Sequence, residues 1–152
     1  MTDLAILGAF ASHAFLDGLS EQHRLRLASG VRPFRAAAGE YLAREGESAK
    51  AFYLIQSGQV GIGSRLGERG AVPIQTLGAG DVVGWSWLLP PHQWQFDARA
   101  VDAVEGLLFD AAWLRDQCES DHELGYHVLK QLLAVLSSRL AASRVQHLDI
   151  YK

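Results

Sequence analysis

The residues best suited to bind a ligand lie in the stretch 77–103, where Trp85, Trp87 and Trp94 fall within ten residues of one another. A glycine turn ending at Gly84 precedes them, and glycine adopts backbone conformations that are closed to other residues. A strand, a glycine turn and a short helical turn together present backbone N–H groups to an anion or a carbonyl. We therefore expect any small molecule to bind under the turn 84–89.

The aromatic segment allows two interpretations. In the first, the three tryptophans, together with His92, line a pocket for a flat or apolar ligand. In the second, the tryptophans fill that space themselves and the pocket is closed. The pair Pro90-Pro91 and His92 have no evident use in filling space, which favours the first interpretation.

The remaining reactive side chains indicate no enzyme and no metal site. His122 and His127 are five residues apart, so they do not share a helical face as a zinc-protease pair does. Cys118 has no evident catalytic partner. Glu45 and Glu47 flank a glycine and are better explained as turn residues than as a catalytic pair.

The composition is that of one globular domain. The chain has 152 residues, of which 49% are hydrophobic and 20% charged, and its net charge of -3 disfavours direct nucleic-acid binding. The single cysteine cannot form an internal disulfide, as expected in a reducing cytosol. The apolar start, residues 4–10, lacks the basic region of a signal peptide and is too short to cross a bilayer. We expect a cytoplasmic protein with no membrane contact.

Residues 1–30 predict two helices. Apolar residues at roughly helical spacing indicate a short helix over residues 2–16. Ser20 is a helix-capping residue, so a second helix is expected from Glu21 to Ser29. Gly30 is the expected C-cap, and Pro33 prevents the helix from continuing.

Residues 31–110 predict a β domain, because short apolar runs alternate with glycine turns. After the aromatic segment, Phe96, Ala98 and Ala100 are expected on one face of a strand and Asp97 and Arg99 on the other. Eight strands at this spacing predict an antiparallel sandwich or barrel. The runs are 31–37, 41–43, 52–55, 60–62, 72–77, 82–83, 98–101 and 106–109.

Residues 111–152 predict a short helix to Gln117 and a long helix from His122 to about His147, capped by Asp121. Gly125 is a weak point within the long helix, worth roughly 1 kcal/mol against alanine. Leucines recur at spacings of four, three and four, which is typical of a coiled-coil seam. We expect this helix to form a homodimer through Leu129, Leu133, Leu136 and Leu140, while Leu132 and Val135 pack on its own domain.

Two segments, 38–47 (AGEYLAREGE) and 52–60 (FYLIQSGQV), resemble the first half of a cyclic-nucleotide-binding domain. More narrowly, they resemble the sensory domain of the bacterial cyclic-AMP receptor protein and fumarate–nitrate regulator superfamily. The run 80–84 (GDVVG) is similar to the entry of that family's phosphate-binding cassette, and residues 139–151 are similar to its dimerisation helix. The resemblance implies a double-stranded β-helix (jelly roll) with N-terminal helices and a long C-terminal helix.

The cassette departs from the family at both polar anchors. The resemblance implies a glutamate for the ribose hydroxyl after the cassette glycine and an arginine for the cyclic phosphate about ten residues later. Here Trp85 follows Gly84, and the arginine position falls on Trp94 or Gln95. Loss of an arginine–phosphate contact costs about 2–5 kcal/mol, so cyclic AMP is not expected to bind with the usual affinity. The expected ligand-binding residues are Gly84, Trp85, Ser86, Trp87, Leu88, Trp94, Gln95 and Arg99.

The sequence thus predicts a stand-alone, dimeric regulatory sensor that binds a small ligand in a modified cassette and signals through its C-terminal helix. The ligand is expected to be a cyclic nucleotide or another small anionic or aromatic molecule. Two alternatives stay open. The domain could be a degenerate one that binds a protein partner and no ligand, or the N-terminal part of a transcription regulator whose DNA-binding module would follow Lys152.

Overall fold

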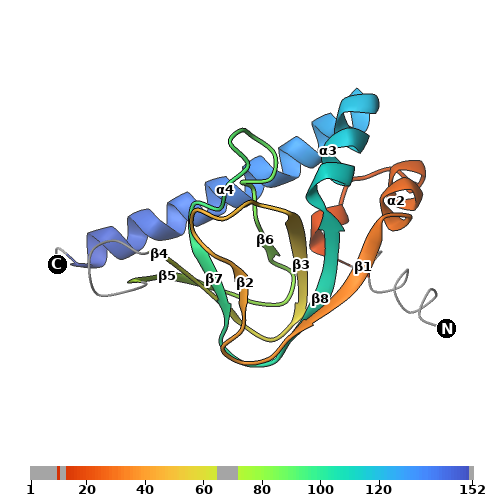
Figure 1. The fold of residues 1–152 in the computed structure, drawn as a ribbon. Coiled ribbons are helices and arrows are strands. Elements are labelled where there is room, and N and C mark those ends of the chain that lie inside the picture. The colour runs from red at the N-terminus through yellow and green to blue at the C-terminus, as the bar shows by residue number, and fades with distance from the viewer. Residues whose placement is uncertain (1–9, 11–12, 65–71, 151–152) are drawn as a thin grey trace.

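The computed structural model describes residue 10, residues 13–64 and residues 72–150. Most of the helix predicted over residues 2–16 lies outside this range. The described end of that segment is the short 3-10 helix η1. At the other end of the chain, the long helix α4 extends from α3 across the β-roll (Figure 1). The elements are η1 (Ala14–Leu16), α2 (Glu21–Ala28), β1 (Val31–Ala36), β2 (Tyr41–Ala43), β3 (Ala51–Ser57), β4 (Val60–Ser64), β5 (Val72–Leu77), β6 (Val82–Val83), β7 (Asp97–Ala100), β8 (Val104–Asp110), α3 (Ala111–Ser120) and α4 (His122–Ile150).

The strands form two four-stranded antiparallel sheets, in the orders β1-β8-β3-β6 and β2-β7-β4-β5. The chain passes repeatedly from one sheet to the other, which is the arrangement of a jelly roll. The predicted fold class is confirmed, and each of the eight predicted strands overlaps an observed one. Pro33 pairs within β1, and a proline fits there because β1 is an edge strand.

The core is centred on the neighbouring strands β3 and β8. Phe52, Leu54, Leu107 and Phe109 are each at most 2% exposed, and the rings of Phe52 and Phe109 stack with centroids 6.3 Å apart. Burial of such side chains contributes about 1.5–3 kcal/mol each. This layer packs the sheet against the N-terminal segment and α3, through Phe15 on Phe52 and Trp113 on Phe109.

Helix α2 begins as predicted, because the side chain of Ser20 accepts a hydrogen bond from the backbone N–H of His23. The predicted C-cap at Gly30 is wrong. Ser29 caps the helix, and Gly30 lies under the ring of Trp113, where a Cβ would come within 2.4 Å of the indole. Glycine is therefore needed at position 30 for close approach to α3.

Helices α3 and α4 are capped by aspartates. Asp110 accepts a hydrogen bond from the N–H of Trp113, and Asp121 accepts one from the N–H of Leu124, as predicted for the second helix. Gly125 is explained by the crossing of the two helices, since a Cβ there would lie 2.8 Å from the carbonyl oxygen of Cys118. No helix in the described part of the chain is long and apolar enough to cross a membrane.

Helix α4 has two apolar faces. Leu124, Val128 and Leu132 are at most 3% exposed and pack on the domain, so the predicted contact of Leu132 with its own domain is confirmed. Leu129, Leu133 and Leu140 are 45%, 56% and 64% exposed, while Leu136 is half-buried. Dimerisation through these four leucines remains a prediction.

We expect Gly106→Ala to destabilise the fold by about 3 kcal/mol, because overpacking of a tight core forces backbone shifts. A Cβ at this position in β8 would lie 2.1 Å from the carbonyl oxygen of Leu54 and 2.8 Å from the ring of Phe34. The matched control is Gly78→Ala, where the nearest atom lies at 3.9 Å and the expected change is within about 0.5 kcal/mol. Urea unfolding followed by tryptophan fluorescence measures both. Equal urea midpoints for the two variants would contradict the close contact between Gly106 in β8 and Leu54 in β3.

Candidate ligand-binding cleft

The turn between β6 and β7 buries two of its three tryptophans. Trp87 has no exposed surface, its Nε1 donates to the carbonyl of Gly84 at 2.8 Å, and its ring centroid lies 5.4 Å from that of Phe52. Trp94 is 4% exposed and lies against Gly84, where a Cβ would come within 2.7 Å of its ring. For these two residues, the structure matches the interpretation in which tryptophans fill the space under the turn.

Backbone hydrogen bonds fix this turn to the loop that precedes β3. The N–H of Trp94 donates to the carbonyl of Glu47 at 2.8 Å, and the N–H of Gly46 donates to the carbonyl of Trp94 at 2.8 Å. From the other side, the guanidinium of Arg115 donates to the carbonyl of Trp87 at 2.7 Å. The turn is thus held at both ends.

The other predicted ligand residues are not brought together. Ser86 is buried, and its hydroxyl has no hydrogen-bond partner among the described residues. Leu88 is half-buried against the α3–α4 junction, and Gln95 is exposed. Arg99 is exposed and donates to the carbonyl of Gly39 at 2.9 Å, which places it on the outer face of its sheet as its strand parity indicated.

The predicted alternation holds for Asp97, which lines the same surface hollow as Arg99, yet Asp97 is only 2% exposed. The reason is a hydrogen bond, because its carboxylate accepts the backbone N–H of Glu45 at 2.8 Å. Alternation predicts which face a residue occupies, but it does not reveal a carboxylate that is buried by capping a neighbouring loop.

Trp85 is the tryptophan of the turn that remains half-buried rather than buried. Its ring centroid lies 4.9 Å from that of Phe96, and the guanidinium of Arg139, on α4, lies 5.6 Å from the centroid of the Trp85 ring. A cation over an indole face is an attractive pair, worth about 0.5–1 kcal/mol at an exposed site. The cassette and α4 therefore meet at this pair.

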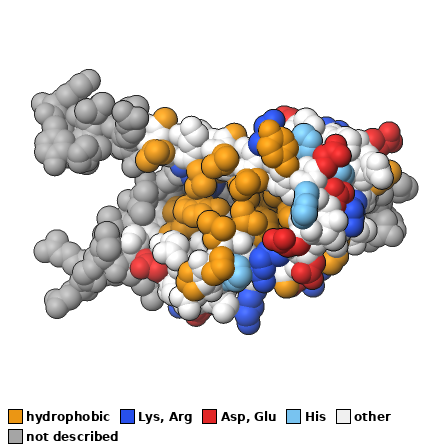
Figure 2. Space-filling view, turned by 90° about the horizontal axis from the view of Figure 1, so that it is seen from above, with side chains coloured by type: hydrophobic (Ala, Val, Ile, Leu, Met, Phe, Trp, Pro, Cys, Tyr) orange, Lys and Arg blue, Asp and Glu red, His pale blue; other side chains and the backbone are white. Residues whose placement is uncertain are grey.

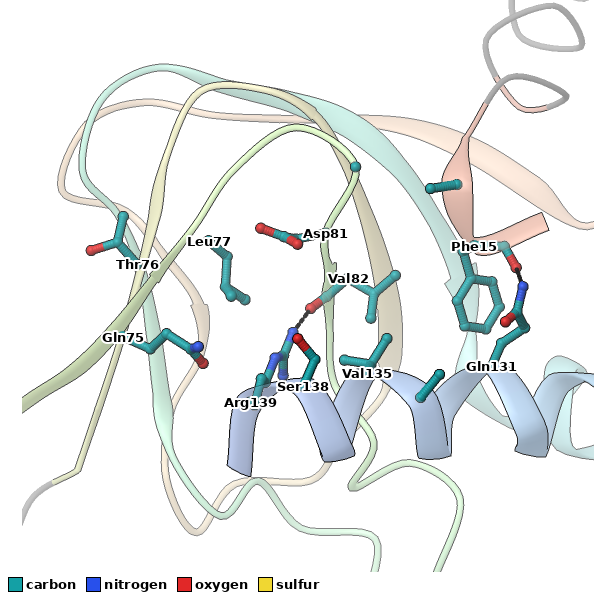
Figure 3. A pocket seen from close by; sticks show the side chains of 13 residues that line it. Phe15, Gln75, Thr76, Leu77, Asp81, Val82, Gln131, Val135, Ser138 and Arg139 are labelled. Atoms are coloured by element: carbon teal, nitrogen blue, oxygen red, sulfur yellow. Dashed lines mark hydrogen bonds between the residues drawn. The ribbon is translucent and has the colours of Figure 1, made fainter. Parts of the chain in front are cut away.

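An open cleft of about 300 Å³ lies between η1, the β5–β6 corner and α4 (Figure 3). Its size is at the lower end of the range for small-molecule sites. Both charged and apolar side chains face it, and they come from segments far apart in the sequence. The lining residues are Ala14, Phe15, Gln75, Thr76, Leu77, Gly80, Asp81, Val82, Gln131, Ala134, Val135, Ser138 and Arg139.

One wall of the cleft is the β5–β6 corner, where Gly80 has a φ of 89° that favours glycine. The carboxylate of Asp81 accepts the N–H of Gly78 at 2.8 Å and so closes the turn. The corner is tied to β3, because the N–H of Ile55 donates to the carbonyl of Asp81 at 2.9 Å and the N–H of Gly80 donates to the carbonyl of Ile55 at 3.0 Å. Asp81 is thereby held at the rim.

The opposite wall is α4. The side-chain amide of Gln131 donates to the carbonyls of Phe15 and Asp17 at 3.0 and 2.6 Å, which fastens α4 to the N-terminal segment. Arg139 lies farther along α4, and its guanidinium donates a hydrogen bond to the carbonyl of Val82. Burial lowers the pKa of Arg139 from its usual value, and the charge of Asp81 partly opposes this shift.

The lining residues of this cleft were not predicted from the sequence, which pointed to the adjacent cassette turn. One pattern could have revealed Arg139. It follows Leu132 and Val135 at spacings of seven and four, so it lies on the apolar face that packs on the domain. A cation on such a face needs a partner, because a buried unpaired charge is costly. Asp81 belongs to the run 80–84 that resembles the cassette entry, but a glycine-aspartate pair in a turn does not indicate that its carboxylate borders a cleft.

The described residues contain no cluster suited to a metal ion, and their one cysteine is a poor nucleophile. No group of three histidine, cysteine or acidic side chains lies close enough to hold a metal ion. Burial, with smaller contributions from Glu119 and Asp121, raises the pKa of Cys118 to about 11. Its reactive thiolate form is therefore scarce at neutral pH, and Cys118 is unsuited to be a nucleophile.

A jelly roll with a cassette-like turn, closed on one side by a C-terminal helix, defines the class of regulatory cyclic-nucleotide-binding-like domains. The family model of the cyclic nucleotide-binding domain matches residues 33–121, more than half of the chain. The chain belongs to this family, as the sequence resemblance implied.

Solved structures of the same fold agree. A cyclic nucleotide-binding domain from Methylobacillus flagellatus KT is 21% identical, with a TM-score of 0.81 over 97% of this chain and 85% of that one. A protein from Geobacter metallireducens GS-15 described as cyclic nucleotide-binding is 19% identical, with a TM-score of 0.78 over 92% of this chain and 98% of that one. The regulatory subunit of a cAMP-independent protein kinase A from Trypanosoma brucei is 25% identical, with a TM-score of 0.65 over 72% of this chain and 40% of that one.

The structure predicts acid sensitivity through His13, which lies behind the β5–β6 corner. Its Nδ1 accepts the N–H of Phe15 at 3.1 Å, so Nε2 carries the proton and donates to the carbonyl of Ile55 at 3.1 Å. Burial lowers the pKa of His13 below 6.5, although the nearby Asp81 and Asp17 oppose the shift. The folded state therefore favours the neutral form of the His13 imidazole. The stability it contributes is therefore present above pH 6.5 and is lost as the pH falls through the lowered pKa.

The test compares urea unfolding of the native protein and His13→Gln at pH 7.5 and pH 5.5. The native protein should lose more stability on acidification than the variant, because the variant has no group to protonate at this position. Equal losses would show that His13 does not carry the effect.

Proposed function

We propose that this protein is a dimeric regulatory sensor that binds a small ligand in the cleft between the β5–β6 corner and α4. The observation that carries the proposal is the position of Arg139. The side chain of Arg139 extends from α4. Its guanidinium donates to the carbonyl of Val82 in β6 and lies over the ring of Trp85 in the cassette turn. One side chain thus links the helix, the roll and the cassette at the edge of the cleft.

This position suits a switch. A ligand shifts a conformational equilibrium only by its differential affinity for the two states. The contact of the half-buried Arg139 with the Trp85 ring is worth about 1–2 kcal/mol, so a ligand of modest differential affinity can draw the guanidinium away. The packing of α4 on the roll would then change, and α4 would carry that change to whatever it binds.

The ligand is expected to differ from cyclic AMP or to bind it in another way. The cassette positions at which the family resemblance implies a glutamate and an arginine are occupied by Trp85 and by Trp94 or Gln95. This chain also resembles the regulatory subunit of a protein kinase A from Trypanosoma brucei, and that kinase is described as cAMP-independent. The domain would act by binding alone, without catalysis, and through a protein partner rather than by contacting DNA itself.

The exposed apolar face of α4 supports a homodimer. Figure 2 shows hydrophobic side chains gathered in a hollow on the face of the molecule viewed there. An apolar groove of about 360 Å³, lined by Leu88, Tyr126 and Leu129 among others, lies between the cassette turn and α4. Farther along α4, Leu133 and Leu140 are also exposed. A second copy of α4 would cover this stripe, which a monomer would leave in water.

One alternative function has an observation in its favour. Trp87 and Trp94 fill the space beneath the cassette, as they would in a domain that has stopped binding ligands and serves only as a protein-interaction module. The cleft at α4 is open all the same, which is why ligand binding is the first proposal. Ligand binding by the native protein, and its loss in Ala134→Trp, would separate the two.

Leu133→Arg should convert the dimer to a monomer, because it places a charge in the centre of the proposed interface, where burial of an unpaired charge is costly. Sedimentation velocity at micromolar protein measures the change. Ala141→Arg, on the same helix and exposed but outside the leucine stripe, is the matched control and should leave the dimer intact. A native protein that sediments as a monomer would remove the dimer from the proposal.

Ala134→Trp should block ligand binding, because the indole would occupy the cleft that Ala134 lines. A thermal-shift screen of cyclic AMP, cyclic GMP and other small anionic and aromatic metabolites identifies ligands of the native protein, and calorimetry then compares the variant. Ala141→Trp is the control and should bind as the native protein does. If no compound shifts the native protein, the interaction module becomes the better explanation. Ligands that bind Ala134→Trp unchanged would place their site elsewhere.

A further inference from the structure

We propose that the cleft at α4 recognises a small organic anion that also carries a hydrogen-bond donor, either a hydroxyl or an ammonium group. Arg139 would hold the anionic group and Asp81 the donor. This inference rests on the proposed function, since it concerns the ligand of the same cleft. It assigns the two ends of the ligand to two residues that lie on opposite walls.

Arg139 has capacity left for an anion. Its guanidinium carries five N–H donors, and the described residues take one hydrogen bond from it, at the carbonyl of Val82. Its other contact is the face of Trp85, which accepts no conventional hydrogen bond. A half-buried guanidinium with unused donors at the edge of a cleft is well suited to a carboxylate or a phosphate, which it can bind in a bidentate manner.

Asp81 has capacity left for a donor. One carboxylate oxygen, Oδ2, accepts the N–H of Gly78 at 2.8 Å, and this bond fixes the orientation of the side chain. No hydrogen bond within the described range occupies the other oxygen. Figure 3 shows the carboxylate on the side of the cleft opposite α4 and Arg139. A ligand hydroxyl or ammonium group could therefore donate to Asp81.

The two charges do not neutralise each other directly. The ion pairs within the described range join His23 and Arg26 to Asp121 and Arg35 to Glu105, and none includes Asp81 or Arg139. A simple anion in the cleft would be attracted by Arg139 and repelled by Asp81. A ligand with an anionic group at one end and a donor at the other satisfies both walls, so the electrostatics favour a bipolar ligand.

The remaining lining limits the size and character of the ligand. Gln75, Thr76 and Ser138 add polar groups on the side of Arg139, whereas Phe15 and Val135 are apolar (Figure 3). A cavity of about 300 Å³ takes a molecule of the size of a nucleotide, a sugar phosphate or an amino acid. Sugar phosphates and nucleotides supply hydroxyl donors, and amino acids supply an ammonium group. These are the two sources that the experiment separates.

The experiment is calorimetric titration of the native protein with four probes: inorganic phosphate, ribose 5-phosphate, cyclic AMP and L-glutamate, with neutral ribose as the blank. At least one of the three bipolar probes should bind more tightly than phosphate, and ribose should not bind. Binding of ribose 5-phosphate or cyclic AMP would identify the hydroxyl source, and binding of glutamate the ammonium source. Phosphate binding as tightly as every bipolar probe, or no binding by any probe, would overturn the inference.

Two variants assign the ends of the ligand. Arg139→Gln should weaken both phosphate and the bipolar ligand, by about thirtyfold or more for the latter. Asp81→Asn should act with opposite signs: it should tighten phosphate binding, because a repulsion is removed, and weaken the bipolar ligand. The amide of Asn can still accept the N–H of Gly78, which preserves the corner. Arg35→Gln, on the exposed face of β1, is the control and should change neither affinity.

These outcomes distinguish failure of the inference from failure of the proposed function. Ligands that Ala134→Trp blocks but that bind equally to the Asp81 and Arg139 variants would overturn the inference and leave a sensing cleft in place. Ligands that depend on both residues and yet leave the hydrogen exchange of α4 unchanged would uphold the inference and contradict signalling through the helix.

Discussion

The close approach of Trp94 to Gly84 is the constraint on which the cassette depends. The indole lies where any side chain at position 84 would have to be, and Trp87 uses its N–H on the carbonyl of the same glycine. Together these contacts fill the space beneath the turn and fix its backbone. An open cleft lies instead beside the cassette, between the β5–β6 corner and α4.

The position of this cleft makes α4 part of the candidate site. A helix that only covered the roll would present apolar side chains to it, as Leu124, Val128 and Leu132 do. Arg139 instead brings a charge to the same face, and its contacts with Val82 and Trp85 are exchangeable ones, a single hydrogen bond and a cation–ring pair. One end of α4 is firmly packed, and the part around Arg139 is held by contacts that break easily. Such a helix can move at the second part while the first stays in place.

The two faces of α4 connect sensing with assembly. The face toward the roll borders the cleft, and the neighbouring face carries the exposed Leu129, Leu133 and Leu140. In the proposed dimer, a ligand-dependent change in the packing of one face would alter the other, because both faces belong to the same turns of the helix. The family fold would thus be kept while the ligand contacts are moved from the cassette to the corner and the helix.

The sequence by itself determined the fold and its local boundaries. Alternating apolar runs and glycine turns predicted the eight strands, and Ser20 and Asp121 marked helix starts, because these signals act over a few residues. Only the tertiary structure decided which tryptophans are buried, why Gly30 and Gly125 must lack a side chain, and that Asp81 and Arg139 border one cleft. These facts depend on contacts between segments distant in the chain, and spacing along a sequence does not encode such distances.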